Sequence, residues 1–261
     1  MIKRLLAIVS AALLLCSCGA SAAQKGTIGI IGAMEDEVTL LKEMASNKKT
    51  TVVSGMEFVE GTIGGNNVVI VQCGIGKVNA GICAEVLITK FNATTIINTG
   101  CAGSLDNDID IGDFVVSTDA VQHDYDVSPI GFERGEIPYT GLYAFPADEG
   151  LQARAKNAIE QSAPDSKIFS GRICSGDQFI YLDEQRETIT SNFGGLCSEM
   201  EGAAIAQVCY LNQVPYVIIR AISDKVDGSE EIEFSEFSKM ASEQCASITG
   251  YMVEHWNDSA D

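Results

Sequence analysis

The sequence predicts an α/β fold: a single three-layer domain whose central sheet is mixed and mostly parallel. From Thr27 onward, apolar runs typical of buried strands alternate with segments of helical pattern. Such alternation produces mostly parallel sheets that helices cover on both faces. The chain has 261 residues, of which 46% are hydrophobic, and it contains no internal repeat, low-complexity tract or linker. One domain with a substantial core therefore accounts for this region.

The first half of this domain begins with a strand and contains a hairpin. "TIGIIGA" is a short apolar run bounded by glycine, which is typical of a buried strand. The "GGNN" stretch between two apolar runs predicts a hairpin turn. The expected elements are a strand at 27–33, a helix at 35–46, a hairpin at 56–74 that turns at 64–67, a helix at 77–91, a strand at 93–103 that ends in a glycine loop, and a strand at 111–121.

The second half begins with a long irregular stretch at 122–148 that contains three prolines. Loops of that length are uncommon inside compact domains and are often functional. "EGAAIAQVCYLNQ" is apolar on all sides, which predicts a buried helix. The expected elements are a helix at 149–163, a strand at 167–176, a helix at 183–193, a short segment at 195–200, a helix at 201–213, a strand at 215–223 and a helix at 234–256.

The first residues resemble an export signal. Lys3 and Arg4 precede an apolar run from Leu5 to Leu15, which is too short to span a membrane as a helix. "LCSCGA" is similar to the lipobox of bacterial lipoproteins, in which the cysteine at the place of Cys18 is lipidated, although Cys16 is unusual there. We expect an exported protein, either periplasmic or anchored in a membrane through Cys18. The predicted division is an export signal with a lipobox (1–18), a short tether (19–26) and one domain (27–261).

Composition excludes several classes of function. The formal net charge of −19 is spread along the chain and does not favour nucleic acid or anionic membrane surfaces, which both need basic patches. The seven cysteines after Cys18 are scattered, and they share no metal-ligand spacing with the two histidines, His123 and His255. We therefore expect buried free thiols and neither a metal nor a cofactor. No GxSxG motif supports a serine hydrolase.

Acidic residues follow three of the predicted strands. Glu35, Asp36 and Glu37 follow the first, and they are either charges that favour a helix start or include one group with a chemical role. Ligands in such folds gather at the carboxyl ends of strands. The glycine turn "GIGK" at 74–77 is either a plain turn or a set of backbone N–H donors for a ligand.

The other two sites follow the later strands. Glu199 and Glu201 precede the buried helix, where a carboxylate needs a partner: either the helix N-terminus or a ligand with paired hydroxyls. Asp224 follows a long apolar strand, so it is either a proton donor with a raised pKa or the partner of Arg220 or Lys225. These acids indicate acid-driven chemistry on a polar small molecule that carries hydroxyl groups.

Seven blocks occur in order along residues 27–256: "IGIIGAMEDEVTLL", "CGIGKVNAG", "IINTGCAG", "GDFVVS", "SGDQFI", "EMEGAAIAQVC" and "VIIRAISD". Together they closely resemble the methylthioadenosine/S-adenosylhomocysteine nucleosidases of the purine nucleoside phosphorylase-like superfamily. The resemblance implies that residues 27–261 form a nucleosidase domain. It also implies hydrolysis of the N-glycosidic bond of 5′-methylthioadenosine and S-adenosylhomocysteine to adenine and the thioribose product.

The resemblance also implies a role for individual residues. Asp224 would be the acid that protonates adenine N7, and Glu37 the base toward the attacking water, so that Glu35 and Asp36 remain helix-start charges. The remaining substrate contacts implied are Glu201 and Met200 at the ribose, Phe179 and the backbone of Ile180 at adenine, Ile75 and Phe234 around the 5′-alkylthio group, and Ser223 beside Asp224.

Two departures from the family pattern concern the substrate pocket. Cys101 stands where the family commonly has serine, and a thiol is the weaker hydrogen-bond donor. In this family a second subunit of a homodimer completes the site from the long loop, which implies a homodimer here. That loop would supply Ile130 and Pro138, with isoleucine where an aromatic residue is frequent.

Three alternatives remain open. One is phosphorolysis of purine nucleosides, for which Arg172 and Arg220 are the strand-associated arginines available, whereas Glu37 would repel phosphate. The second is hydrolysis of a futalosine-type nucleoside on the same fold. The third is a non-catalytic nucleoside-binding lipoprotein, although binding alone would not require both an acid and a base.

Overall fold

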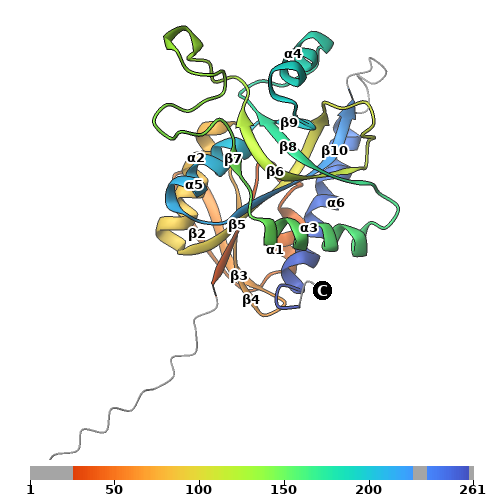
Figure 1. The fold of residues 1–261 in the computed structure, drawn as a ribbon. Helices are drawn as coiled ribbons and strands as arrows, with labels where there is room; N and C mark the ends of the chain where they lie inside the picture. Colours follow the sequence, from red (N-terminus) through yellow and green to blue (C-terminus); the bar gives the residue numbers. More distant parts are fainter. Residues whose placement is uncertain (1–25, 226–233, 259–261) are drawn as a thin grey trace, which may run out of the picture.

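A computed structural model describes residues 26–225 and 234–258 (Figure 1). The predicted export signal, the tether up to residue 25 and Cys18 lie outside these residues. The strands are β1 Thr27–Gly32, β2 Ser46–Val53, β3 Met56–Ile63, β4 Asn66–Gln72, β5 Ala93–Ser104, β6 Phe114–Gln122, β7 Phe145–Pro146, β8 Ile168–Ser175, β9 Cys197–Glu199 and β10 Tyr216–Lys225. The helices are α1 Thr39–Met44, α2 Lys77–Phe91, the 3-10 turn η1 Ser128–Ile130, α3 Glu149–Ser162, α4 Asp183–Phe193, α5 Gly202–Asn212 and α6 Phe234–Glu254.

The sheet is mixed, with a parallel centre. Strands β4, β1, β5 and β10 pair in parallel in that order, while β3 and β2 extend the sheet by antiparallel pairing beyond β4. On the other side, β6 is antiparallel to β10 and β8 is parallel to β6. β9 then pairs with both β8 and β5, so β5, β10, β6, β8 and β9 form a closed ring. The carboxyl ends of the central strands consequently converge on one edge.

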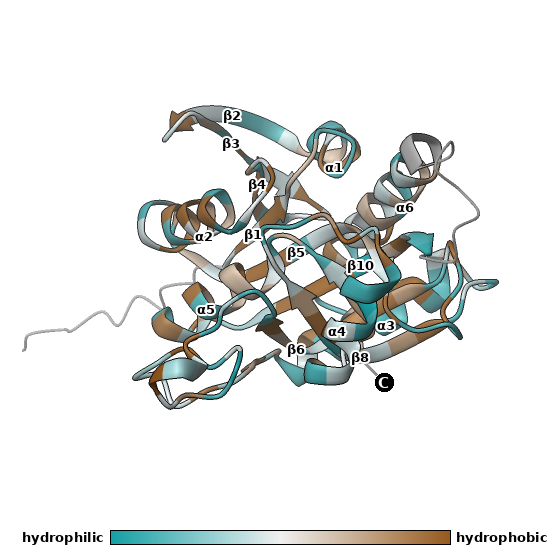
Figure 2. Cartoon of the chain, turned by 90° about the horizontal axis from the view of Figure 1, so that it is seen from above, coloured by the Kyte–Doolittle hydropathy of each residue, from teal (hydrophilic) through white to brown (hydrophobic). Residues whose placement is uncertain are grey.

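Helices cover both faces of this sheet, which confirms the predicted three layers (Figure 2). Ile30 and Ile31 are neighbours in β1 and point to opposite faces, because side chains alternate along a strand. Ile31 joins a core cluster with α2 and α5, and Ile30 joins a second cluster with α1, α3 and α6. α5 is buried along most of its length, as its apolar sequence predicts.

Two predicted boundaries near the acids are wrong. The helix expected at 35–46 spans only Thr39–Met44, and the chain before it forms turns in which Glu35 and Asp36 are exposed. The reason is that the Glu37 carboxylate folds back onto the backbone N–H groups of Ala33 and Met34, which holds these turns in place of a helical start. Ser46 already belongs to β2, a largely exposed polar strand that pairs with β3.

The glycine loop predicted at the end of 93–103 is a strand. β5 continues to Ser104 because neighbours on both sides pair with its glycine-rich end: Cys101 pairs with Ala221 in β10, and Gly103 pairs with Ser198 in β9. The hairpin turn lies at Gly64 and Gly65, both in the left-handed region that favours glycine. Asn66 already begins β4.

Two other expectations, the irregular stretch after β6 and the free cysteines, are confirmed. Between β6 and α3 the chain is largely irregular and contains only η1 and the two-residue strand β7. All seven cysteines of the described chain are free, and six of them are buried. Within the described ranges, no helix has both the length and the apolar character needed to cross a membrane.

Candidate active site

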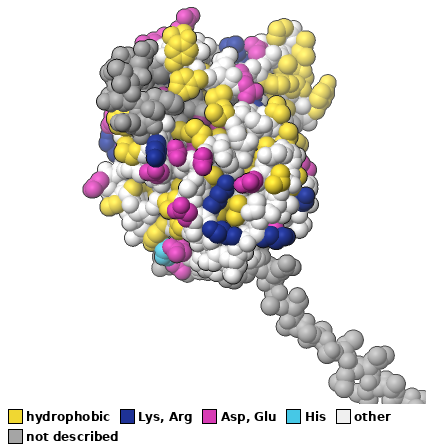
Figure 3. All heavy atoms as spheres, turned by 180° about the vertical axis from the view of Figure 1, so that it is seen from behind, with side chains coloured by type: hydrophobic (Ala, Val, Ile, Leu, Met, Phe, Trp, Pro, Cys, Tyr) yellow, Lys and Arg dark blue, Asp and Glu magenta, His cyan; other side chains and the backbone are white. Residues whose placement is uncertain are grey.

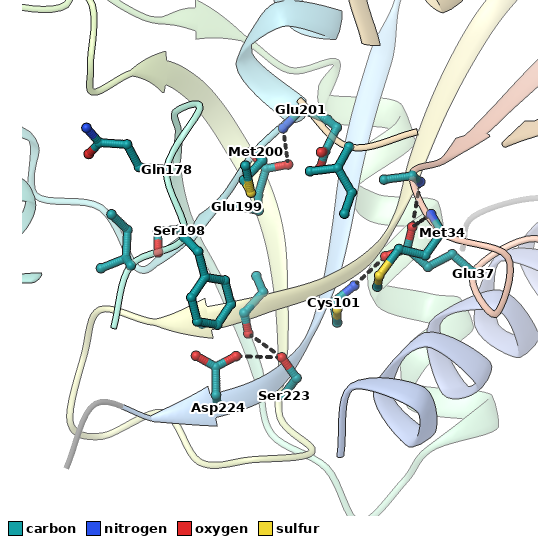
Figure 4. A pocket seen from close by; sticks show the side chains of 16 residues that line it. Met34, Glu37, Cys101, Gln178, Ser198, Glu199, Met200, Glu201, Ser223 and Asp224 are labelled. Carbon is teal, nitrogen blue, oxygen red and sulfur yellow. Dashed lines mark hydrogen bonds between the residues drawn. The ribbon is translucent and has the colours of Figure 1, made fainter. Parts of the chain in front are cut away.

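One cavity of about 190 Å³ opens where the carboxyl ends of the central strands meet (Figure 4). Segments distant in sequence line it: the turns after β1 and β4, the ends of β5 and β10, the loop after β8, and the junction of β9 with α5. Nine residues singled out from the sequence lie in its wall: Glu37, Ile75, Cys101, Phe179, Ile180, Met200, Glu201, Ser223 and Asp224. The sheet edge predicted to carry the site is therefore where these side chains converge.

Three other candidate residues are not in this wall. Ile130 lies in η1 and Pro138 lies further along the same loop, and Ile130 is 73% exposed. Phe234 begins α6, and its side chain lies outside the part of the chain that the structure describes. The wall also contains Glu199, which the sequence left between a helix terminus and a ligand, and six residues that the sequence did not single out: Ala33, Met34, Ala102, Gly103, Gln178 and Ser198.

Glu37 is a buried carboxylate in the turns that follow β1, with 3% of the residue exposed. Its Oε2 accepts hydrogen bonds from the backbone N–H groups of Ala33 at 2.5 Å and Met34 at 2.9 Å, and its Oε1 accepts one from Cys101 at 3.2 Å. Burial raises the pKa of Glu37, although Arg220 and the three backbone donors act in the opposite direction. The result is a fixed carboxylate whose proton affinity is higher than usual.

Gly100 makes room for this arrangement. A Cβ atom at this position in β5 would lie 2.3 Å from Oε1 of Glu37 and 2.7 Å from Nη1 of Arg220. Both contacts are far shorter than side chains tolerate. A glycine in the middle of a central strand weakens the strand, so its presence here reflects the close approach of two functional groups to the backbone.

Glu199 and Glu201 have different partners, and only Glu199 takes the helix terminus that the sequence offered to both. Glu199 accepts hydrogen bonds from the backbone N–H groups of Glu201 and Gly202 at the start of α5, and it also pairs with Arg220 and Ser175. Glu201 points elsewhere: its Oε1 accepts from the backbone N–H of Gly76, in the glycine turn, at 2.8 Å. Glu199 therefore satisfies the helix terminus, while Glu201 remains available to the cavity.

Arg220 is the cation beneath this acidic wall, with 2% of the residue exposed. Its Nη2 donates to Oδ1 of Asn98 at 2.7 Å and pairs with Glu199, and it lies 3.9 Å from Oε2 of Glu201. Although burial alone would lower the pKa of Arg220, the neighbouring glutamates raise it, so the group stays charged. The sequence offered this arginine as a partner of Asp224 or as a phosphate ligand, and its pairing with Glu199 was not predicted.

Asp224 is not paired with either of the cations considered from the sequence. Arg220 pairs with Glu199, and Lys225 turns to Asp110 at 2.5 Å. Asp224 instead accepts a hydrogen bond on Oδ1 from the hydroxyl of Ser223 at 2.7 Å. Burial raises the pKa of Asp224, and the Ser223 contact opposes that change only in part. Figure 4 shows Glu37 and Asp224 approaching the cavity from different sides.

The remaining wall residues are apolar or neutral. Burial and the nearby Glu37 charge raise the pKa of the Cys101 thiol to about 12, so this group is protonated near neutral pH. Phe179 is about half exposed, whereas Ile180, the next residue, is buried. No group of three or more His, Cys, Asp or Glu side chains among the described residues is arranged to hold a metal ion.

The Glu201 carboxyl makes stability depend on pH. Burial and the Glu199 charge raise the pKa of Glu201 to about 8, although the Arg220 charge acts in the opposite direction. The folded state therefore holds a proton that the unfolded state loses above pH 4.5, so this contribution is full below pH 4.5 and is lost as the pH rises toward 8. Glutamine carries no titrating proton, so Glu201→Gln should not lose stability as the pH rises. We expect its Tm to exceed that of the unsubstituted protein by several degrees as the pH rises from 5 to 8, since each kcal/mol of unfolding free energy shifts Tm by about 2–4 °C.

Thermal unfolding at several pH values measures this effect. Glu187→Gln, on the exposed face of α4, is the control and should leave the pH dependence unchanged. Tm curves for Glu201→Gln and the unsubstituted protein that run parallel over this range would contradict the prediction.

Comparisons with known proteins agree with this geometry. The family model of the phosphorylase superfamily matches residues 27–254. The 5′-methylthioadenosine/S-adenosylhomocysteine nucleosidase of Staphylococcus carnosus is 42% identical over 228 residues, which cover 87% of this chain and 99% of the relative.

Solved structures give the same result. The 5′-methylthioadenosine/S-adenosylhomocysteine nucleosidase of Neisseria meningitidis, in complex with methylthio-immucillin-A, matches with a TM-score of 0.83 at 38% identity, over 87% of this chain and 98% of that one. The futalosine hydrolase of Helicobacter pylori matches with a TM-score of 0.82 at 31% identity, over 88% of this chain and 98% of that one. The chain belongs to the phosphorylase superfamily and, within it, to the family of methylthioadenosine/S-adenosylhomocysteine nucleosidases.

Proposed function

We propose that this protein hydrolyses the N-glycosidic bond of 5′-methylthioadenosine and S-adenosylhomocysteine, releasing adenine and the thioribose product. The observation that carries the proposal is the arrangement of Glu37, Glu201 and Asp224, three carboxyl groups with raised pKa values on one cavity. Cleavage of such a bond develops positive charge on the ribosyl ring and negative charge on the departing purine. A wall with a fixed base, Glu37, and a protonated acid, Asp224, is suited to that separation of charge.

Asp224 is the proton donor to the leaving base in this mechanism. Its buried carboxyl keeps its proton to a higher pH than an exposed aspartate, and Ser223 fixes Oδ1 so that Oδ2 can face the ligand. Adenine leaves more readily when N7 is protonated, because the base that takes the electron pair of the breaking C–N bond then departs as a neutral molecule. This role requires Asp224 to be protonated when the substrate binds.

Glu37 accepts a proton from the attacking water. Three backbone N–H groups hold its carboxylate in place, so its orientation does not depend on the ligand. Its raised pKa increases its strength as a base near neutral pH. Its negative charge also faces the side from which a nucleophile would approach the ribose, where it would favour water over phosphate.

The remaining wall residues bind the substrate. Glu201, held by the Gly76 N–H, accepts hydrogen bonds from the ribose hydroxyls, with Met200 against the sugar. Phe179 stacks on adenine and the backbone of Ile180 contacts its polar edge. Ile75 lines the end that receives the alkylthio group.

The structure argues against phosphorolysis. Arg172 is committed to Asp119 at 2.7 and 3.0 Å, and Arg220 is buried in its contacts with Glu199 and Asn98. Neither arginine lines the cavity. A futalosine-type substrate is the second candidate, supported by the likeness to the Helicobacter pylori hydrolase. The capture of nucleosides without catalysis would leave the raised pKa values of Glu37 and Asp224 without a purpose.

Release of adenine from methylthioadenosine by the purified protein, with and without phosphate, tests the proposal. Release of adenine and free methylthioribose at a rate independent of phosphate would support hydrolysis. Strict dependence on phosphate would assign the protein to the phosphorylases. Faster cleavage of a futalosine-type nucleoside, or tight binding without cleavage, would replace the proposal with one of the other candidates.

Replacing Cys101 by serine is expected to raise kcat. The neutral thiol is a weak donor beside Glu37, and a hydroxyl at the same place would hold the attacking water better. One improved hydrogen bond corresponds to about a twofold to tenfold gain. Steady-state kinetics of Cys101→Ser measure the gain, with Cys101→Ala as the control that offers no donor. Equal kcat values for the serine and alanine variants would contradict the prediction.

We also propose a homodimer in which the long loop of one subunit completes the site of the other. Ile130 and Tyr139 on this loop are 73% and 101% exposed. Ile75 in the cavity wall is 55% exposed, and Val78 in the first turn of α2 is 73% exposed. Hydrophobic side chains gather at the upper right of the face in Figure 3, the side on which this loop lies. Light scattering measures the mass and tests the dimer.

Mixing inactive Asp224→Asn and Ile130→Asp proteins should restore activity if Ile130 and Pro138 act across the interface. In the mixed dimer, one site combines an intact Asp224 with an intact loop from the other subunit.

Export and lipidation form a separate proposal. The family match begins at residue 27, after the apolar segment and Cys18, so the first residues are additional to the shared domain. We propose that they direct the protein to the periplasm or anchor it in a membrane through lipid on Cys18. Mass spectrometry of the mature N-terminus tests this, with Cys18→Ser as the control.

A further inference from the structure

Two chain segments of the cavity wall meet a third segment outside that wall. They are the glycine turn that leads into α2, the loop after β8 that carries Phe179 and Ile180, and the start of the long loop after β6. Lys77, Asp124 and Asp177 contribute one residue from each segment. None of the three lines the cavity.

These three residues form a closed ring of hydrogen bonds. The Lys77 ammonium donates to Oδ1 of Asp124 at 2.5 Å. The other oxygen of Asp124 accepts from the backbone N–H of Asp177 at 2.9 Å, and Oδ1 of Asp177 accepts from the backbone N–H of Lys77 at 2.8 Å. Each member thus makes two bonds, one to each of the others. The ring fixes the three segments relative to one another.

The ring is partly shielded from water. The side chains of Lys77 and Asp124 are 15% and 18% exposed, and the Lys77 ammonium also donates to Oε1 of Gln122 at 3.0 Å. Burial alone would raise the pKa of Asp124, but its contacts with Lys77 and Asp177 hold it below the usual value. A partly buried pair with this geometry is stronger than an exposed surface pair.

Two members of the ring, Lys77 and Asp177, lie next to residues that contact the proposed ligand or orient a group that does. Gly76, directly before Lys77, donates its N–H to Glu201 at 2.8 Å. Phe179 follows Asp177 by two residues in the same loop. The same loop also packs closely on His123. A Cβ atom built on Gly176 would lie only 2.3 Å from Nε2 of His123, so this glycine lets the loop approach the imidazole. The ring therefore joins the turn that orients Glu201 to the loop that carries Phe179.

We propose that Lys77 is a positioning residue that holds the Phe179–Ile180 loop at a set distance from Glu201, so that base and ribose are bound together. This inference rests on the proposed function for its effect on the substrate. Because Lys77 does not reach the cavity, its loss acts on binding and not on the chemical step. The contribution of one hydrogen bond to a charged group corresponds to about a tenfold change in affinity.

Kinetics of Lys77→Met provide the first test. We expect KM for methylthioadenosine and Kd for adenine to rise about tenfold while kcat stays within about twofold. Lys77→Arg, which keeps the charge, should recover most of the affinity. Arg172→Met is the matched control, because it breaks another partly shielded ion pair, at 26% and 24% side-chain exposure, away from the cavity. A fall in kcat with unchanged KM, or no change in either, would overturn the proposal.

Hydrogen exchange provides a second test that needs no substrate. Amides of residues 176–181 should exchange about tenfold faster in Lys77→Met than in the unsubstituted protein or in Arg172→Met. Asp177→Ala, in an exposed loop, should have the same effect if Lys77→Met does not fold. Unchanged exchange in both variants would refute the ring. Faster exchange in a protein that cleaves no thioether nucleoside would leave the ring standing and refute the proposed function alone.

Discussion

Asp224→Asn is expected to lower kcat/KM for methylthioadenosine about 1,000-fold, within the range of general acid catalysis. Asparagine keeps the shape of the side chain and can still accept a hydrogen bond from Ser223. It cannot transfer a proton to adenine N7, so the base would have to leave as an anion. The loss should therefore appear in the chemical step and only slightly in the binding of adenine.

A substrate that needs no acid sharpens this test. The leaving group of 4-nitrophenyl 5-methylthioriboside departs as an anion, so Asp224→Asn should be only mildly slower than the unsubstituted protein on it. Ser223→Ala is the matched neighbour: it removes the hydrogen bond to Asp224 and leaves the acid in place, and a loss below that of Asp224→Asn is expected. Undiminished release of adenine by Asp224→Asn would refute the assigned mechanism.

The order of strands and helices follows from the sequence because each element carries its own hydrophobic pattern. The hairpin at Gly64–Gly65 and the buried α5 are examples in which local composition decides the structure. β2 could not be predicted, because its sequence is polar and lacks an alternating buried face. It is a strand because it pairs with β3. The glycine-rich end of β5 escapes for a similar reason, since β10 and β9 hold it extended.

Two features located the site in the sequence: acids directly follow the strands, and seven ordered blocks resemble a known family. Which acid has which partner could not be predicted, because Arg220 selects Glu199 over Asp224 through the pairing of β10 with β5 and of β5 with β9. Local sequence contains no record of that juxtaposition. The predicted start of the helix after β1, at residue 35, was also wrong. The hydrogen bonds of the Glu37 side chain, and not helical propensity, determine the path of the chain there.

Glu37→Gln is expected to lower kcat/KM at least about 100-fold on both substrates, with the nitrophenyl riboside as strongly affected as methylthioadenosine. Activation of water is needed whichever leaving group departs, so this variant and Asp224→Asn should differ on the substrate that needs no acid. The amide also cannot accept all three backbone hydrogen bonds: its NH₂ group would face either the Ala33 and Met34 N–H groups or that of Cys101. Some loss of stability should accompany the loss of rate.

A stronger nucleophile distinguishes the loss of the base from the loss of stability in Glu37→Gln. Azide needs no base, so added azide should restore cleavage of the nitrophenyl riboside by Glu37→Gln if the carboxylate acts on water. Thermal unfolding of the same variant gives the structural part of the effect, and Glu35→Gln, in the exposed turn two residues earlier, should change neither rate nor Tm. If azide gave no recovery while adenine binding was intact, Glu37 would be acting on the developing charge of the ribosyl ring and not on the water.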